Sequence, residues 1–229
     1  MKIFELDPRT NVLAMASFVL SLIAIGSQLA DYLSGPRPRI HPPTSIALRS
    51  VPTGNGQAKI DVYATAVGLT NTAGSAYPEI VTEVLVEFTG PHGRPVQMKW
   101  WAFEQAADAT PSHPDKFNET KAVSTTPQVI PGGGAIGWST IFVPYGKECA
   151  AGSNCNRNDN FLQVDDRTAE WAARGGIEFR FVAHRVTSAT PLVGTCRTPR
   201  FDPAQVDVSG MQGDFKRRGW ITLACDKSA

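Results

Sequence analysis

The chain has 229 residues, enough for one domain of ordinary size with an appendage, and its hydrophobic fraction of 42% is sufficient for a core. The 22 Lys and Arg residues nearly balance the 21 Asp and Glu residues, so no overall field attracts nucleic acid, and we expect no nucleic-acid partner. The 20 glycines and 17 prolines are spread along the chain without an internal repeat, which is typical of many short strands joined by turns.

The N-terminal part of the chain contains a long uncharged segment. Residues 1–10 form a short charged flank, and residues 11–33 follow with no charged side chain before Asp31. A membrane-spanning helix needs about 20 apolar residues, whereas the hydrophobic part of a signal peptide needs about 7 to 15. The segment predicts a transmembrane anchor, with a signal peptide cleaved near Ala24-Ile25-Gly26 as the alternative. A buried helix of a soluble domain is disfavoured, because the segment lacks a polar stripe.

The charges on either side of this segment do not fix its orientation. Lys2 and Arg9 precede it and Arg37 and Arg39 follow it, so the count of positive charges is nearly equal. Residues 34–43 are rich in proline and cannot form a helix, which predicts a semi-rigid extended spacer. We expect the folded domain to occupy residues 44–229.

Much of residues 44–229 shows the alternation of apolar and polar side chains that predicts half-buried β-strands. The clearest segments are residues 60–66, 84–88, 96–100, 136–142 and 177–181, and shorter candidates are residues 45–48, 128–130, 191–194 and 220–224. Only residues 166–174 predict a helix, ended by Gly175 and Gly176. We therefore expect a mainly β chain, an immunoglobulin-like antiparallel β-sandwich preceded by one N-terminal transmembrane helix, with a closed barrel as the alternative.

Residues 67–78 read VGLTNTAGSAYP and have a predicted strand on either side. This segment resembles the strand-Asn-turn-Pro-strand opening of immunoglobulin-like domains in poorly characterised bacterial membrane-anchored proteins. The resemblance implies a surface-presented interaction or accessory domain. Because the chain lacks the Cys-Trp-Cys spacing of antibody-type domains, no functional residues are carried over from the family.

The four cysteines all lie in the second half of the predicted domain. Proximity in sequence favours disulfides between Cys149 and Cys155 and between Cys196 and Cys225, although four cysteines allow three pairings. Disulfides would place the domain in an oxidising compartment outside the cytoplasm, either periplasmic or at the cell surface. A zinc site is the alternative, and it is disfavoured because no C-x-x-C motif is present and no His lies close in sequence to a Cys.

One polar segment has oxygen-bearing side chains at spacings similar to those of a calcium-binding loop. The candidate ligands are Asn154, Asn156, Asn158, Asp159 and Asp165. The segment contains few carboxylates, and Asp159 stands where such a loop requires glycine. A polar loop without metal is therefore the favoured interpretation.

A candidate surface for a partner lies in the long polar connection over residues 103–122, because long loops on rigid sheets often carry binding functions. The named candidates are Trp100 and Trp101 just before the connection, and His113 and Asp115 within it. If the alternation holds, one of the two indoles packs inward and the other faces solvent, where it could anchor a partner. A plain packing role for both indoles is the favoured interpretation.

No Ser, His and acid set has the flanking residues of a known hydrolase motif, and no cofactor motif is present in a suitable context. The sequence therefore favours a membrane-tethered accessory or interaction protein without catalytic residues or a cofactor. Its expected partners are membrane lipid, through the N-terminal helix, and a protein of the membrane or envelope. A small metal- or ligand-binding module and an uncharacterised enzyme remain the alternatives.

Overall fold

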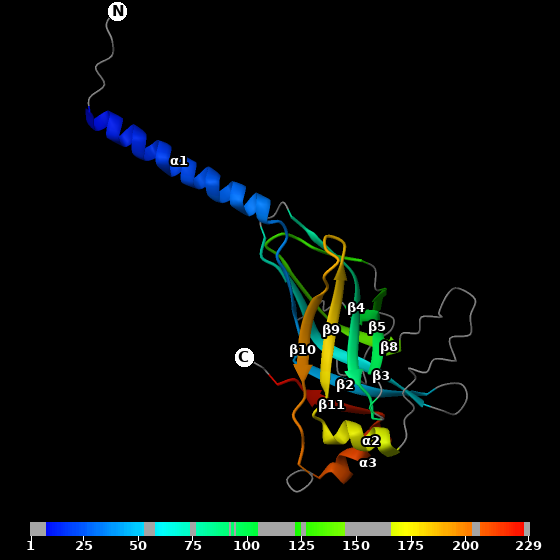
Figure 1. Ribbon diagram of the computed structural model, residues 1–229. Coiled ribbons are helices and arrows are strands. Elements are labelled where there is room, and N and C mark those ends of the chain that lie inside the picture. The colour runs from blue at the N-terminus through cyan, green and yellow to red at the C-terminus, as the bar shows by residue number, and fades with distance from the viewer. Residues whose placement is uncertain are drawn as a thin grey trace, which may run out of the picture.

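A long helix, α1 (Pro8–Ser34), leads into one end of a β-rich body in the computed structural model of the chain (Figure 1). The structure describes residues 8–52, 58–73, 77–91, 93, 95–104, 122–124, 127–144, 166–202 and 207–226. We call the end of the body that α1 enters the proximal rim. The opposite end, where two short helices lie, is the distal end (Figure 1).

The two short helices are α2 (Asp166–Arg174) and α3 (Val208–Arg218). The described strands in chain order are β1 (Pro38–His41), β2 (Ser45–Pro52), β3 (Ala58–Asn71), β4 (Glu79–Thr89), β5 (Pro95–Glu104), β6 (Ala122–Ser124), β7 (Gln128–Ile130), β8 (Ala135–Pro144), β9 (Glu178–Arg185), β10 (Leu192–Arg197) and β11 (Trp220–Ala224). All nine strand segments expected from the alternation of side chains lie within or overlap these strands.

The apolar character of α1 is confirmed over most of its length. Its segment Val12–Ala30 is long and apolar enough to cross a membrane, and none of it is buried against the body. Every side chain from residue 12 to residue 30 is exposed, so no face of the helix packs on the sheet. The helix is thus not a core helix of the β-rich body.

The described strands form one antiparallel sheet in the order β10-β9-β4-β5-β8-β3-β2-β11, with β1, β6 and β7 paired alongside β3, β5 and β4. This sheet curls into a half-barrel, so the mainly β, antiparallel prediction is confirmed (Figure 1). The immunoglobulin-like sandwich of two stacked sheets is not confirmed. The alternative prediction, a closed barrel, agrees better with the curvature of the sheet than the sandwich does, but the sheet is only a half-barrel.

β-Bulges interrupt the long strands and account for the curvature. The register of β3 against β8 shifts between Ala64 and Val67, where Ala66 adopts a left-handed φ of 58°. Further shifts lie in β4 between Val81 and Glu83 and in β5 between Trp100 and Ala102. A bulge bends its strand and increases the local twist, so repeated bulges curl one sheet over its own core.

The concave face of the sheet holds the core. Its largest side chains are aromatic, and their rings meet across the interior: Trp100 against Trp138 at 6.2 Å and Phe142 against Phe181 at 5.7 Å between centroids. A second, smaller cluster of Ala47, Tyr63 and Ile141 is buried on the other face of the sheet. The main cluster thus fills the inside of the half-barrel, and the smaller cluster lies outside it.

The two edges of the curled sheet are joined. Cys196 of the edge strand β10 forms a disulfide with Cys225, which follows the other edge strand, β11. Next to it, the amide of Asp226 donates to the carbonyl of Arg197 at 2.7 Å. The predicted pairing of Cys196 with Cys225 is confirmed, whereas Cys149 and Cys155 lie outside the described residues.

The helices α2 and α3 close the distal end. The predicted helix over residues 166–174 is confirmed as α2, which buries Thr168, Ala169, Ala172 and Ala173. Helix α3 was not expected, because two glycines interrupt its sequence, VSGMQGDFKRR. It forms because Asp207 caps its N-terminus, Gly219 adopts the left-handed conformation at its C-terminus, and Phe215 is fully buried.

The expected spacer is extended, but part of it belongs to the sheet. Strand β1 pairs with the end of β3, from Pro38 opposite Asn71 to His41 opposite Gly68. Proline is tolerated at position 38 because it is the first residue of a short strand outside the main strand order. The chain therefore enters the sheet before Thr44, and residues 38–41 do not hold the body away from α1.

We expect loss of the Cys196–Cys225 disulfide to destabilise the half-barrel strongly. The bond closes a loop with a sequence separation of 29 residues, and chain-entropy arguments give about 3–4 kcal/mol for a loop of this length. The double variant Cys196→Ala with Cys225→Ala should lose about this much stability in urea unfolding of the full chain in mild detergent. Val193→Ala, at an exposed position of β10, serves as the control, and equal stability of the two variants would contradict the closure.

Candidate functional site

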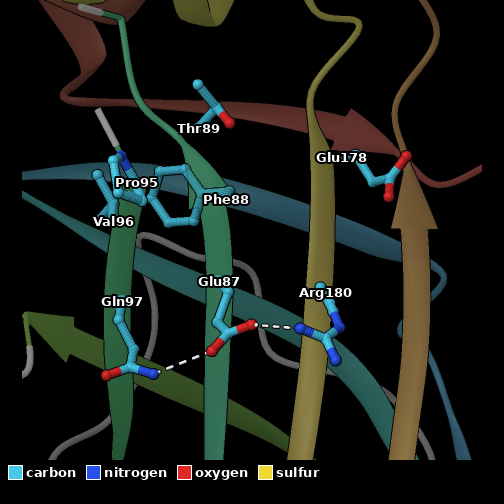
Figure 2. A pocket seen from close by; sticks show the side chains of 8 residues that line it. All are labelled: Glu87, Phe88, Thr89, Pro95, Val96, Gln97, Glu178 and Arg180. Carbon is cyan, nitrogen blue, oxygen red and sulfur yellow. Dashed lines mark hydrogen bonds and ion pairs between the residues drawn. The ribbon is translucent and has the colours of Figure 1, made fainter. Parts of the chain in front are cut away.

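The outer face of the sheet carries an open groove of about 730 Å³ at the distal ends of β4, β5 and β9 (Figure 2). Polar side chains of the outer face and apolar residues at the strand ends line it together. The lining residues are Glu87, Phe88, Thr89, Pro95, Val96, Gln97, Glu178 and Arg180.

Glu87 lies at the centre of a polar row that crosses three strands (Figure 2). It is opposite Gln97 on β5 and opposite Arg180 on β9. Gln97 Nε2 donates to Glu87 Oε1 at 3.0 Å, and Arg180 Nη1 donates to Glu87 Oε2 at 2.9 Å. Both carboxylate oxygens accept a hydrogen bond, so this geometry suits binding of a polar group better than proton abstraction by Glu87.

A second ion pair lies at the distal edge of the groove. Arg197 of β10 donates through Nε to Glu178 Oε2 at 3.2 Å across the β9–β10 pairing. The hydrogen bond to Glu178, and then the charge of that carboxylate, raise the pKa of Arg197 above its usual value. Arg197 therefore stays cationic at any physiological pH.

A smaller hollow of about 370 Å³ adjoins the groove between the β4–β5 connection and α2. Two arginines, Arg174 and Arg200, line it together with Trp171. Arg174 forms an ion pair with Glu170 one turn earlier in α2. Gly175 forms part of the wall with a φ of 61°, and a Cβ there would lie 2.2 Å from the carbonyl oxygen of Pro199.

The two predicted tryptophans separate as the alternation suggested. Trp100 is 1% exposed in the core, whereas Trp101 is 51% exposed at the bulge of β5. Only Trp101 is therefore placed to contact a partner. The other two residues proposed for partner binding, His113 and Asp115, lie outside the described residues.

The proposed calcium ligands also lie outside the described residues. These are Asn154, Asn156, Asn158, Asp159 and Asp165. Among the residues that are described, no group of three or more His, Cys, Asp and Glu side chains is placed to hold a metal ion. Of the two described histidines, His41 in β1 contacts Thr70, and His184 in β9 lies opposite Glu83.

Sequence reasoning missed the groove. The alternation placed Glu87, Gln97 and Arg180 on solvent-facing positions, but it did not indicate that they meet. Glu87 and Arg180 are 93 residues apart in the sequence, and the register of β4 against β9 brings them together. The one signal of the groove in the sequence was that Glu and Arg, which can form an ion pair, both occur at solvent-facing positions of predicted strands.

A carboxylate of a different kind lies at the proximal rim. Glu79, at the start of β4, is completely buried. Its Oε1 accepts from the amide of Ile80 at 3.0 Å, while Oε2 accepts from the Thr187 hydroxyl and lies 3.5 Å from Arg185 Nη1. These contacts tie the start of β4 to the turn between β9 and β10.

No protein-family model, no curated protein and no solved structure matches the chain.

Glu79 and Glu87 provide a matched pair for testing which carboxylate supports the fold. We expect Glu79→Gln to lower the free energy of unfolding by about 1.5–3 kcal/mol, because an amide nitrogen would face Arg185 or the Thr187 hydroxyl in a buried place. Glu87→Gln should cost less than about 1 kcal/mol, because its ion pair is exposed to solvent. Chemical unfolding of the full chain in detergent measures both, and a larger loss for Glu87→Gln would refute this division.

Proposed function

We propose that the protein is a membrane-tethered accessory protein that presents its β-rich domain outside the cytoplasm to another component of the membrane or envelope. In this proposal it binds and does not catalyse a reaction. The observation that carries the proposal is that every side chain of α1 from residue 12 to residue 30 is exposed, beside a body that has a buried core of its own.

The length of α1 supports the tether. The segment Val12–Ala30 has 19 residues, which corresponds to about 28 Å of helix, close to the hydrocarbon thickness of about 30 Å. Large side chains such as Phe18, Leu20 and Ile23 are more than half exposed on the helix surface. Water is an unfavourable surrounding for so much apolar surface, whereas lipid is a favourable one.

The disulfide supports a location of the body on the non-cytoplasmic side of the membrane. A stable bond between Cys196 and Cys225 forms and persists in oxidising compartments and is rare in the cytosol. It lies in the body, at the seam that holds the half-barrel together. A body that depends on this bond would fold outside the cytoplasm, in the periplasm or at the cell surface.

The outer-face groove is the best supported place for a partner. It lies at the distal end, away from α1, where it faces the surroundings of a tethered domain. The charges in it pair within the sheet, so a partner would be recognised by hydrogen bonds and shape more than by net charge. Trp101, on the same outer face of β5, adds an aromatic side chain of the kind that interfaces favour.

A ligand-binding module is the second candidate, because the groove and the adjoining hollow are of a size that small molecules occupy. The two candidates differ in what would be found in the groove. A protein partner would cover the groove and the outer face of β5 together, whereas a small molecule would fill the groove alone.

A photo-crosslinking amino acid at Gln97, in the full chain and in native membranes washed with alkaline carbonate, tests the proposal. We expect the chain to remain in the washed membranes and to form one discrete adduct with a membrane or envelope protein. The same amino acid at Thr222, an exposed position on β11 away from the groove, is the control. Loss of the chain from the membranes would exclude the tether, and equal crosslinking from both positions would exclude the groove as the partner site.

A further inference from the structure

A short row of apolar side chains lies on the outer face of the sheet at the proximal rim. Val129 of β7 is opposite Ile80 of β4, and the amide of Val186 donates to the carbonyl of Ile80 at 2.9 Å from the other side. The exposed fraction is 55% for Val129 and 63% for Val186, and Ile80 is partly exposed between them. Three neighbouring residues, two in strands and one directly after β9, thus present apolar groups to the surroundings.

This row differs from the rest of the same outer face. Near the distal end, the corresponding row consists of Gln97, Glu87 and Arg180, which bond to one another. In between, Glu83 forms an ion pair with Lys99 at 2.7 Å. The outer face therefore changes from polar to apolar towards the end that α1 enters.

The connection from α1 to the rim is short. Only Gly35 and Pro36 separate Ser34, the last residue of the helix, from Arg37, whose amide donates to Asn71 Oδ1 at 3.0 Å. The amide of Thr72 in turn donates to the Arg37 carbonyl at 3.3 Å. An extended chain spans at most about 3.6 Å per residue, so this connection holds the rim within about 11 Å of the end of α1.

These lengths place the end of α1 at the depth of lipid headgroups and Arg37 no more than about 11 Å from it. The apolar span ends at Ala30, and the four residues from there to Ser34 rise about 6 Å along the helix axis. Headgroups add about 5–8 Å to each side of the hydrocarbon core. A rim fixed this close to α1 therefore lies at the membrane surface when α1 spans the bilayer.

Buried polar contacts hold the row in place relative to the connection. Asn71 is 1% exposed, and its Nδ2 donates to the Tyr77 carbonyl at 2.7 Å, just before β4 begins. Glu79 then binds the side chains of Arg185 and Thr187, the two residues that flank Val186. The connection, the β3–β4 turn and the β9–β10 turn therefore form one bonded unit.

We infer that the proximal rim is a second membrane-contact surface, which lies on the bilayer that α1 spans. Val186 and Val129 enter the interfacial region, and the exposed side chains of Arg37 and Arg39 lie among the headgroups, where anionic lipid favours them. The occupant of the apolar row is phospholipid and not a second protein. This inference rests on the proposed tether through α1.

A nitroxide-bearing amino acid introduced in place of Val186 tests the contact. The full chain is reconstituted in vesicles of phosphatidylcholine and phosphatidylglycerol, and accessibility to oxygen and to a water-soluble nickel complex is measured by electron paramagnetic resonance. Val193 is the matched control: an exposed valine opposite Val182 on β9, about 13 Å further from the rim along the strand. We expect a ratio of oxygen to nickel accessibility that is several-fold higher at position 186 than at position 193.

Flotation of the same vesicles separates this inference from the tether. If the chain floats with the lipid and positions 186 and 193 have the same ratio, the rim contact is wrong and the tether stands. If the chain does not float, the tether fails and the rim contact fails with it. Floating together with a selectively lipid-exposed position 186 supports both.

Discussion

The structure depends first on the joining of the two edges of one curled sheet. Strands β10 and β11 are the two ends of the main sheet. The disulfide between Cys196 and Cys225 and the adjacent backbone bond from Asp226 to Arg197 bring these edges together. These two bonds hold the edges together at one point, and the curled sheet surrounds the aromatic core of Trp100, Trp138 and Phe142.

A second constraint acts at the end of the sheet nearest α1. Asn71 and Glu79 are polar and buried, and leaving either without its partners would be costly. Asn71 bonds Arg37, which follows α1, to Tyr77, which precedes β4. Glu79, at the start of β4, bonds that strand to Arg185 at the end of β9. The half-barrel and its tether are thereby joined through hydrogen bonds, and not only through a covalent linker of two residues.

Together these constraints give the body two different ends. The proximal rim is fixed to the apolar helix and carries apolar side chains, whereas the distal end has the groove around Glu87 and the hollow beside Arg174. A body that is held at one end and hollowed at the other is suited to presenting a binding surface at a set distance from a membrane. This division of the molecule underlies the proposed function.

Much of the fold was accessible from the sequence, because it follows from local patterns. Helix α2 and strands β7 and β11 begin and end at the residues that periodicity indicated, and α1 follows from its uncharged length. The curvature was not accessible, because a bulge such as that at Ala66 leaves no clear mark in the alternation of side chains. Helix α3 was missed because glycines at positions 210 and 213 lower its propensity, which capping and burial of Phe215 overcome.

The candidate site was less predictable than the fold. The exposure of Trp101 followed from alternation, but the groove depends on the register between strands that are far apart in sequence. Glu79 gave no signal either, since a glutamate at the start of a strand is ordinarily solvated. Its burial results from the approach of the β9–β10 turn, which is a property of the assembled sheet.

Amide hydrogen exchange of Arg37, measured on the full chain in lipid nanodiscs, tests most directly whether body and tether form one bonded unit. The account predicts that this amide exchanges slowly, because it donates to the buried Asn71 side chain, and that Asn71→Ala removes the protection. Exchange of the Arg37 amide at the rate of an unstructured chain would contradict it, and would mean that the half-barrel hangs from a flexible linker.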